Sequence, residues 1–302
     1  MCALHGAEGE RWLQQLPGLL ASYSHRWSLI LETPFTAPSY NYVVRARRAD
    51  GSPVALKLGV PHRELLTEIE ALRLYDGRGC ARLLAADPAG GALLLERLAP
   101  GTMLVSIDDD ERATRIAARV MQQLWRPLPE QHSFPTTAQW AGGMQRLRAT
   151  FDGGCGPFPR RLVEAAERLF RELLDSSQPP VLLHGDLHHY NILAAQREPW
   201  LAIDPKGLSG EPLYETGALL RNPLPQVASR SDLRRTLARR AAILAETLQA
   251  DRQRILAWAL AQAVLSSWWS YEDEGKQGEE TLSIAGELLQ LNEGQANVTN
   301  GR

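Results

Sequence analysis

Short runs of apolar and β-branched residues, separated by turn residues, fill the first hundred positions of the chain. Three of these runs lie at residues 27–31, 42–46 and 54–58, and their lengths are typical of strands. Asp50-Gly51 stands between the second and the third run, and this dipeptide tolerates the positive φ of a tight turn. The pattern therefore predicts a β-hairpin over residues 42–58, preceded by one more strand.

A helix and two further strands are predicted after the hairpin. In residues 62–75, leucine and isoleucine recur at helical spacing, so that they share one face. Residues 81–86 and 92–96 are apolar runs with Asp, Pro and Gly between them, a composition that predicts two strands joined by a turn.

After Pro100-Gly101 the pattern changes to helical periodicity. Helices are predicted at residues 108–125, 136–151 and 160–174 and again up to about residue 293, with a strand–loop–strand segment at 181–204 between them. This order predicts an α+β fold of two lobes. The N-terminal lobe, residues 1–98, would hold a small antiparallel sheet and one key helix, and residues 99–302 would form a mostly helical C-terminal lobe.

Composition narrows the class of protein. A chain of 302 residues with 44% hydrophobic and 23% charged residues is typical of a globular protein, and a formal net charge of −2 disfavours nucleic acid as a partner. The three cysteines are far apart in sequence, which fits a reducing compartment. The most apolar stretch, residues 255–269, is too short to span a membrane, and no apolar signal core opens the chain. We expect a cytoplasmic protein, monomeric or weakly dimeric.

The segment from residue 181 to 204 carries the candidate chemistry. An apolar run at 181–183 leads into a loop with Asp186 and Asn191, and a second apolar pair at 202–203 delivers Asp204 to a strand end. Two carboxylates and one carboxamide then converge with no cation beside them in the sequence. Because uncompensated carboxylates held close together are unfavourable, a divalent metal is expected, and oxygen ligands select a hard ion such as Mg²⁺.

A lysine on a predicted strand adds to this set. Strand alternation places Ala55 and Lys57 on one face, which leaves room for a flat base and puts an ammonium near its phosphates. Glu68, on the helix that follows, is the expected partner of Lys57, with Glu64 and Glu70 as competing candidates on the same helix. A lysine–glutamate pair with a catalytic Asp, a metal-binding Asn and a metal-binding Asp is the set that kinases use.

Together these segments resemble the aminoglycoside phosphotransferases of the protein-kinase-like fold. More narrowly, they resemble the branch of streptomycin 6-kinases and hydroxyurea phosphotransferases. The similarity covers residues from about 10 to 290. It is carried by residues 54–58, 93–98, 184–189 together with Asn191, 200–205, 210–211 and 221–223.

The resemblance implies a role for each matching position. Asp186 would orient or deprotonate the acceptor hydroxyl, and Asn191 and Asp204 would hold Mg²⁺. Lys57 would bind the α- and β-phosphates of ATP or GTP, with Glu68 holding Lys57 in place.

The resemblance also implies how the rest of the nucleotide is bound. Glu96, Arg97 and Leu98 would meet the adenine edge through their backbone, with Ala55 beside the base. The turn that covers the phosphates has no glycine-rich signature, and Ser39 is the candidate contact there.

The acceptor site is predicted in the helical lobe. Trp269 and the acidic run Glu272, Asp273 and Glu274 combine an aromatic face with carboxylates, a composition that suits a cationic polyol such as an aminoglycoside. The same residues also fit a core tryptophan and a capped helix end. Tyr190, where relatives often have Glu, Pro or Gly, would face the acceptor side.

The predicted function is Mg²⁺-dependent transfer of a γ-phosphoryl group from ATP or GTP to a hydroxyl of a streptomycin-like aminoglycoside. Hydroxyurea or another small metabolite is the alternative acceptor. A kinase-like module without turnover is a third possibility, against which the complete set of functional residues argues. The most remote alternative is a metal-dependent hydrolase built on His184, His188 and His189.

Overall fold

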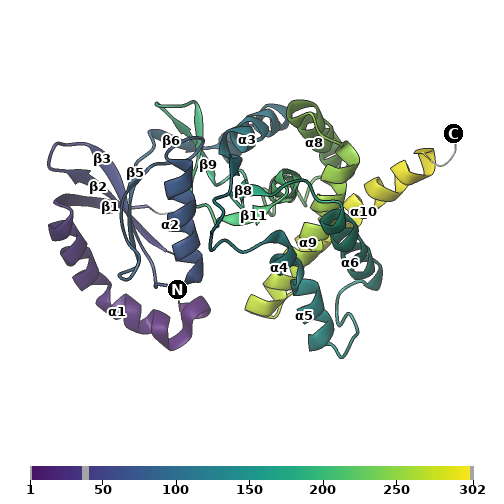
Figure 1. The fold of residues 1–302 in the computed structure, drawn as a ribbon, viewed down its shortest axis with the longest axis horizontal. Helices are drawn as coiled ribbons and strands as arrows, with labels where there is room; N and C mark the ends of the chain where they lie inside the picture. The colour runs from purple at the N-terminus through teal and green to yellow at the C-terminus, as the bar shows by residue number, and fades with distance from the viewer. Residues whose placement is uncertain (1, 36–40, 300–302) are drawn as a thin grey trace.

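The computed structural model describes residues 2–35 and 41–299 and has two lobes that lie side by side (Figure 1). The N-terminal lobe holds an antiparallel sheet, and the second lobe is mostly helical, so the predicted α+β, protein-kinase-like architecture is confirmed. Ser39, the predicted phosphate contact, lies outside the described residues. No helix of the described ranges is long and apolar enough to cross a membrane.

The N-terminal lobe is built on a five-stranded sheet with the strand order β1-β2-β3-β5-β4. Its strands are β1 (Leu29–Pro34), β2 (Tyr42–Arg48), β3 (Pro53–Leu58), β4 (Leu83–Asp87) and β5 (Ala92–Glu96). The predicted hairpin is present, because β2 and β3 pair in antiparallel register across a turn in which Gly51 has φ of 81°.

The two faces of this sheet pack on different helices. Val54, Leu56 and Leu58 point toward α1 (Cys2–Arg26), where they join a buried cluster with Trp12. The alternate residue Ala55 faces α2 (Arg63–Tyr75), on the opposite side of the sheet. The period of two therefore places Lys57 on the face that carries α2.

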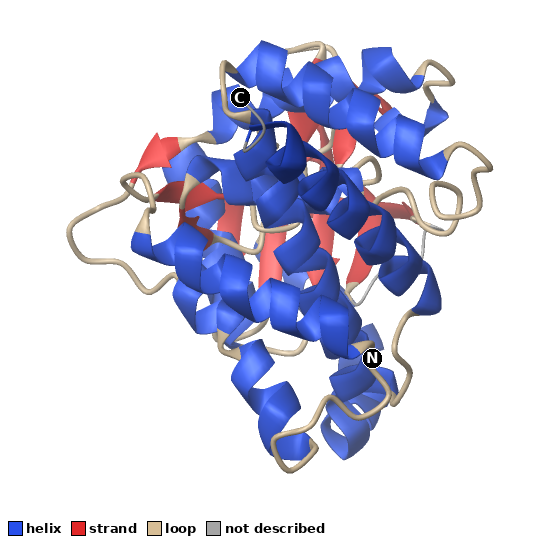
Figure 2. Cartoon of the chain, turned by 90° about the vertical axis from the view of Figure 1, so that its right-hand side faces the viewer, coloured by secondary structure: helices blue, strands red, loops and turns tan. Residues whose placement is uncertain are grey.

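The helical lobe packs around α9 (Arg252–Glu274), a long and mostly buried helix. Its other helices are α3 (Asp110–Leu124), α4 (Thr137–Ala141), α5 (Gly143–Thr150), α6 (Arg160–Asp175), α7 (Thr216–Leu220), α8 (Leu233–Leu248) and α10 (Glu279–Thr299), with the short 3₁₀ segments η1 (Leu104–Ser106) and η2 (Pro212–Glu215). α9 contacts α6, α7, α8 and α10. Seen from the side of the helical lobe, the helices lie in front of the strands (Figure 2).

One predicted helix is divided. The single helix expected over residues 136–151 is two helices, α4 and α5, which meet at Gly142. Thr136 caps the first one through a capping box with Gln139, and the glycine pair at 142–143 weakens helical continuity.

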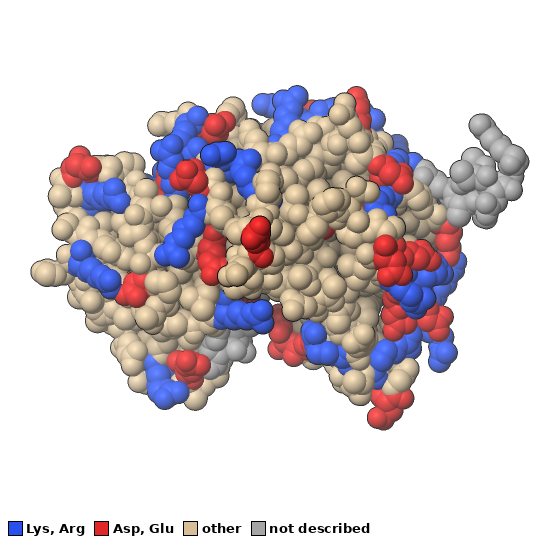
Figure 3. All heavy atoms as spheres, in the orientation of Figure 1, with Lys and Arg blue, Asp and Glu red and all other residues tan. Residues whose placement is uncertain are grey.

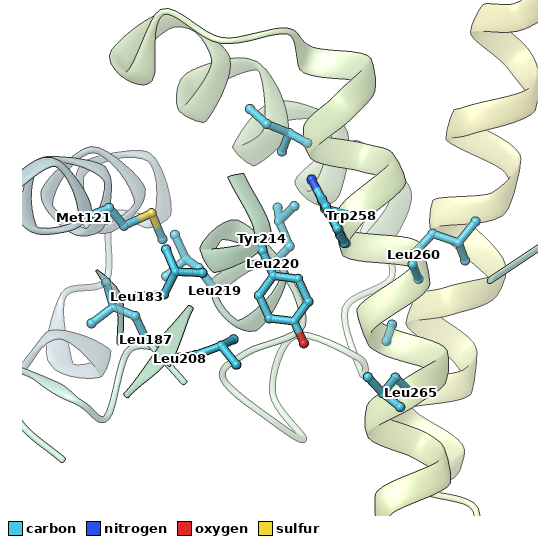
Figure 4. Packing of buried hydrophobic residues seen from close by; sticks show 14 of the residues in the cluster. Met121, Leu183, Leu187, Leu208, Tyr214, Leu219, Leu220, Trp258, Leu260 and Leu265 are labelled. Carbon is cyan, nitrogen blue, oxygen red and sulfur yellow. The ribbon is translucent and has the colours of Figure 1, made fainter. Parts of the chain in front are cut away.

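Two small sheets in the helical lobe carry the loop between β8 and β9. One has the order β11-β8-β7, with β11 (Leu208–Gly210), β8 (Val181–Leu183) and β7 (Arg126–Pro127), and the other has the order β10-β9-β6, with β10 (Trp200–Ala202), β9 (Ile192–Ala195) and β6 (Pro100–Met103). Figure 4 shows how the loop is anchored: Leu183 and Leu187 enter the core opposite Tyr214 and Trp258. Leu187 is fully buried, which fixes the loop at its centre.

Candidate active site

The loop of residues 184–191 is held by a buried carboxylate. Glu215, at the end of η2, accepts hydrogen bonds from the backbone N–H groups of His184 (2.6 Å) and Gly185 (3.0 Å). Its side chain is buried, and burial raises the pKa of Glu215 to about 7, while the backbone N–H groups lower it. Glu215 was not among the predicted site residues. The signal for a role is an acidic residue inside an apolar segment, because a buried carboxylate needs such partners.

His184 links this loop to the strand end that carries Asp204. Its Nε2 lies 2.8 Å from the carbonyl oxygen of Ile203, and its Nδ1 accepts from the N–H of Asp186 at 3.3 Å. Burial lowers the pKa of His184 to about 4, so the ring is neutral and Nε2 carries the proton that Ile203 accepts. The N–H of Ile203 in turn donates to the carbonyl of Asn191 at 2.9 Å. The two segments are therefore locked together just before Asp204.

Asp186 presents a partly exposed carboxylate between two nitrogen-bearing side chains. Oδ2 lies 3.6 Å from Nε2 of His188, and Oδ1 lies 3.6 Å from Nη2 of Arg221. Burial raises the pKa of Asp186, but the nearby His188 and the charge of Arg221 outweigh it and bring the pKa down to about 2. Asp186 is therefore ionised at neutral pH.

Lys57 lies between two carboxylates. Its Nζ contacts both oxygens of Glu68, at 2.7 and 2.9 Å, and Oδ1 of Asp204 at 3.1 Å. These carboxylates raise the pKa of Lys57 against the effect of its burial. The two other acids considered on α2 face elsewhere, since Glu64 pairs with Lys206 and Glu70 accepts from Ser133 at 2.6 Å.

These contacts correct one expectation from the sequence. The carboxylates were predicted to converge with no accompanying cation in the sequence, and in the structure Lys57 lies beside Asp204 and Arg221 lies beside Asp186. Arg221 is the functional residue that the sequence analysis missed most clearly: it matched the family branch, but it is 35 residues from Asp186 along the chain, and no local pattern connects the two.

The oxygens that face the site fit a magnesium ion. The Nδ2 of Asn191 donates to the carbonyl of Asp186 at 3.0 Å, which turns Oδ1 away from that bond. Asp204 has a φ of 58°, a left-handed conformation that is uncommon outside glycine and frequent at functional sites, and within residues 2–35 and 41–299 no donor is bound to its Oδ2. One amide and one carboxylate oxygen, completed by phosphates and water, is a donor set of the kind Mg²⁺ uses.

The histidines do not form a metal site of their own. Across the part of the chain that the structure describes, no three residues of the types His, Cys, Asp and Glu come together as a metal-binding group. His184 is committed to the contacts given above, and the ring of His189 is buried. The hydrolase alternative therefore has no support from the arrangement of these side chains.

The predicted nucleotide-edge residues lie at the joint between the lobes. The carboxylate of Glu96 binds Arg197 at 2.9 Å, and its backbone N–H donates to the carbonyl of Arg82. Arg97 pairs with Glu32 of β1 at 2.5 Å. Ala55 and Leu95 are register partners on neighbouring strands, on the same face of the sheet as Lys57. Because the N–H of Glu96 is already bonded, any backbone contact from an N–H to a base falls to Arg97 or Leu98.

The predicted acceptor residues divide into two groups. Trp269 meets Trp140 edge to face, with ring centroids 5.2 Å apart, and Trp140 packs against the loop. A Cβ at Gly185, where φ is 86°, would lie 3.2 Å from the Trp140 ring, so glycine is needed there. Tyr190 contacts His188 edge to face. The structure thus brings these aromatic residues to the loop.

The acidic group lies at the end of α9. Glu272 forms a bidentate ion pair with Arg146 at 2.7 and 2.9 Å, which neutralises its charge. Asp273 and Glu274 are exposed in the last turn of the helix. Acidic side chains are visible at this end of the helical lobe, next to the hollow between the lobes (Figure 3).

Comparisons with known proteins agree with this geometry. The family model described as aminoglycoside/hydroxyurea antibiotic resistance kinase matches residues 26–274. The chain is 34% identical over 269 residues to streptomycin 6-kinase of Streptomyces griseus, covering 89% of the chain and 87% of the relative. It is 37% identical over 294 residues to hydroxyurea phosphotransferase of Kitasatospora aureofaciens, covering 94% and 82%.

Solved structures with low sequence identity share the fold. A thermostable mutant of aminoglycoside phosphotransferase APH(4)-Ia, in a ternary complex with ADP and hygromycin B, matches with a TM-score of 0.65 at 11% identity, over 90% of this chain and 97% of that one. Choline kinase LicA from Streptococcus pneumoniae matches with a TM-score of 0.62 at 14% identity, over 92% and 98%. From the family match and the sequence relatives, the chain belongs to the aminoglycoside/hydroxyurea antibiotic resistance kinase family.

Proposed function

We propose that the chain is a Mg²⁺-dependent phosphotransferase that moves the γ-phosphoryl group of ATP, or GTP, to a hydroxyl of a streptomycin-like aminoglycoside. The observation that carries this proposal is the position of Lys57 between Glu68 and Asp204, at 2.7 and 3.1 Å, with Asp186 and Asn191 on the adjoining loop. This set supplies a phosphate-binding ammonium, metal-binding oxygens and an ionised carboxylate for the acceptor.

Each residue has a distinct task in the proposed reaction. Lys57 binds the α- and β-phosphates, and Glu68 keeps its ammonium in place. Asn191 and Asp204 hold the metal, which when bound neutralises charge on the phosphates. The acceptor oxygen attacks the γ-phosphorus while the bond to the β-phosphate oxygen breaks and the nucleoside diphosphate leaves.

Asp186 deals with the proton of the acceptor. An ionised carboxylate accepts a hydrogen bond from the hydroxyl and so directs the oxygen lone pair at the phosphorus. The low pKa of Asp186 makes it a weak base, so we expect it to take the proton late, as the new P–O bond raises the acidity of the hydroxyl, and to release it to water. The main contribution of Asp186 is therefore orientation.

The choice of an aminoglycoside rests on the relatives and on the acceptor side. Two relatives are streptomycin 6-kinases, at 34% and 32% identity. The aromatic pair Trp140 and Trp269 beside the loop, and the exposed carboxylates of Asp273 and Glu274, suit an acceptor that carries guanidinium or amine groups.

Hydroxyurea is the second candidate acceptor. The relative named hydroxyurea phosphotransferase is 37% identical over 94% of the chain. The ion pair between Arg146 and Glu272 also reduces the negative charge available to a cationic acceptor. A small neutral acceptor needs no acidic surface.

The test is a coupled nucleotide-turnover screen of streptomycin, other aminoglycosides and hydroxyurea, each with ATP and with GTP, with the phosphorylated position located by NMR. We expect turnover that requires Mg²⁺ and an O-phosphorylated streptomycin. Turnover with hydroxyurea alone would support the second candidate. A protein that binds Mg-nucleotide but phosphorylates none of these acceptors would refute the proposed acceptor class.

The same proposal places the enzyme in the cytoplasm, where nucleoside triphosphates are supplied and the free, buried Cys80 and Cys155 stay reduced.

A further inference from the structure

The buried side chain of Arg221 contacts the carboxylate of Asp186. Arg221 follows the last residue of α7, and its side chain is almost entirely enclosed. Its Nη2 lies 3.6 Å from Oδ1 of Asp186, on the side opposite to His188. Arginine keeps its charge when buried, and a buried guanidinium needs partners, so Arg221 acts on this carboxylate as an ion-pair partner at close range.

Arg221 is held from the helix side of the site. Its Nη1 donates to Oε1 of Gln262, a buried residue of α9, and Nε2 of Gln262 donates to the carbonyl of Tyr214 at 3.2 Å. The approach of Gln262 requires glycine at position 217, because a Cβ there would lie 2.4 Å from Oε1 of Gln262. The guanidinium therefore takes its position from α7 and α9, not from the loop.

We propose that Arg221 is a positioning residue for phosphoryl transfer, which fixes the orientation of the Asp186 carboxylate toward the acceptor hydroxyl. The torsion that rotates an Asp carboxylate has a broad, shallow preference, so the carboxylate needs contacts to stay in one plane. Arg221 on one oxygen and His188 on the other select that plane. This inference rests on the proposed role of Asp186 in the transfer reaction.

A purely structural role for Arg221 predicts different behaviour. In that case the arginine would only neutralise a buried acid, and its loss would lower stability without a specific effect on turnover. The chain offers a matched control in Arg254 of α9, which binds the buried Glu211 at 2.5 Å and the carbonyls of Leu173 and Ser176. Arg254 has no contact with residues 184–191 in the described structure.

The first experiment compares steady-state kinetics and melting temperatures of Arg221→Gln, Arg221→Lys and Arg254→Gln. We expect Arg221→Gln to lower kcat by about 10- to 100-fold, because small misplacements of a reacting group have effects of this size, while the KM for nucleotide stays near the parent value. Arg221→Lys should recover part of kcat, since it keeps the charge but loses the planar fork. Arg254→Gln should lower the melting temperature and leave kcat unchanged. If Arg221→Gln behaves like Arg254→Gln, the inference is overturned.

A double-mutant cycle tests whether Arg221 acts through Asp186. In an Asp186→Asn background, adding Arg221→Gln should change kcat by less than about twofold, since residues that act as a unit are not additive. A full multiplicative loss would mean that Arg221 acts elsewhere.

Crystal structures of the parent and of Arg221→Gln with Mg²⁺ and a non-hydrolysable nucleotide give a readout that needs no acceptor. We expect the Asp186 side chain to rotate in the variant; an unchanged rotamer would overturn the inference. If the parent phosphorylates none of the screened acceptors, the proposed function fails, and the crystal structures still decide the role of Arg221.

Discussion

Replacing Glu68 by glutamine perturbs the most deeply buried ion pair of the site. The side chains of Lys57 and Glu68 are 3% and 8% exposed, and the ammonium contacts both carboxylate oxygens. Glutamine has nearly the same shape but no charge. In Glu68→Gln, the one carboxylate that remains beside Lys57 in the described part of the chain is that of Asp204, whose side chain is 38% exposed.

The expected loss of stability follows from these contacts. Removing one partner of a buried ion pair typically lowers the free energy of unfolding by about 3–5 kcal/mol. Because Asp204 still pairs with Lys57, we expect the lower end of that range, about 3 kcal/mol. For a chain of this size this corresponds to a fall in melting temperature on the order of 5–10 °C, measured by thermal unfolding in the presence of a chelator.

The same substitution should change the magnesium requirement. With Glu68 neutral, Lys57 pairs more strongly with Asp204 and competes with the metal for the same carboxylate. We therefore expect the Mg²⁺ concentration for half-maximal rate to rise several-fold at saturating nucleotide. Initial rates over a Mg²⁺ series measure this effect.

Two neighbouring acids on α2 are matched controls. Glu64 is half-exposed and pairs with Lys206, and Glu70 accepts a single bond from Ser133. Exposed pairs of this kind contribute about 0–1 kcal/mol, so Glu64→Gln and Glu70→Gln should stay close to the parent in both assays. If Glu68→Gln unfolds at the same temperature as Glu70→Gln and needs no more Mg²⁺, the reasoning about the Lys57 pair is refuted.

Three further variants, two single and one triple, test the rest of the site. Asp186→Asn should lower kcat by roughly 10²–10⁴-fold and leave nucleotide affinity in calorimetric titrations nearly intact, and near-native turnover would remove Asp186 from the mechanism. Asp204→Ala should abolish the Mg²⁺-dependent part of nucleotide affinity, so equal affinity in mutant and parent would contradict the metal assignment. Neutralising Glu272, Asp273 and Glu274 together should raise the KM for a cationic acceptor but not for nucleotide, and added salt should weaken acceptor capture more in the parent than in the variant. If neither the triple substitution nor added salt changes the KM for the acceptor, the acceptor binds at a site other than this acidic group.

The sheet of the N-terminal lobe was predictable because its signals are local. Alternation at residues 53–58 places Leu56 on the face toward α1 and Ala55 on the face toward α2, as the period of two requires. The turn at Gly51 needs a positive φ that the Asp-Gly dipeptide supplies. Neither inference depends on residues distant in the chain.

The small strands of the helical lobe could not be predicted in the same way. β7 has two residues and β11 has three, too few to show a period. Both form by pairing with β8, and β6 forms by pairing with β9, more than 80 residues later in the chain. Their conformation is set by tertiary pairing, which local propensity does not contain.

Some residues of the site could be predicted from local sequence signals, and others could not. Asp186 and Asn191 lie in one loop, so a contiguous motif revealed them. Glu215 and Arg221 lie on a different segment, and only packing of η2 and α7 against the loop brings them to it. The pairing of Lys57 with Glu68, in contrast, followed from a strand face and a helix face that are adjacent in the chain.

The charge balance of the assembled site explains why the missed cation matters. Three carboxylates, on Glu68, Asp186 and Asp204, face two cations, Lys57 and Arg221. Lys57 contacts Glu68 and Asp204. Among these three acids, Arg221 contacts Asp186. Glu68 and Asp204 therefore share one cation, and within residues 2–35 and 41–299 no donor is bound to Oδ2 of Asp204. The sequence placed Lys57 near the phosphates but showed no cation beside Asp186 and Asp204, and this suggested that a metal was needed to hold these acids together. In the structure Lys57 and Arg221 contact them, and Oδ2 of Asp204 is the oxygen that we propose for the metal.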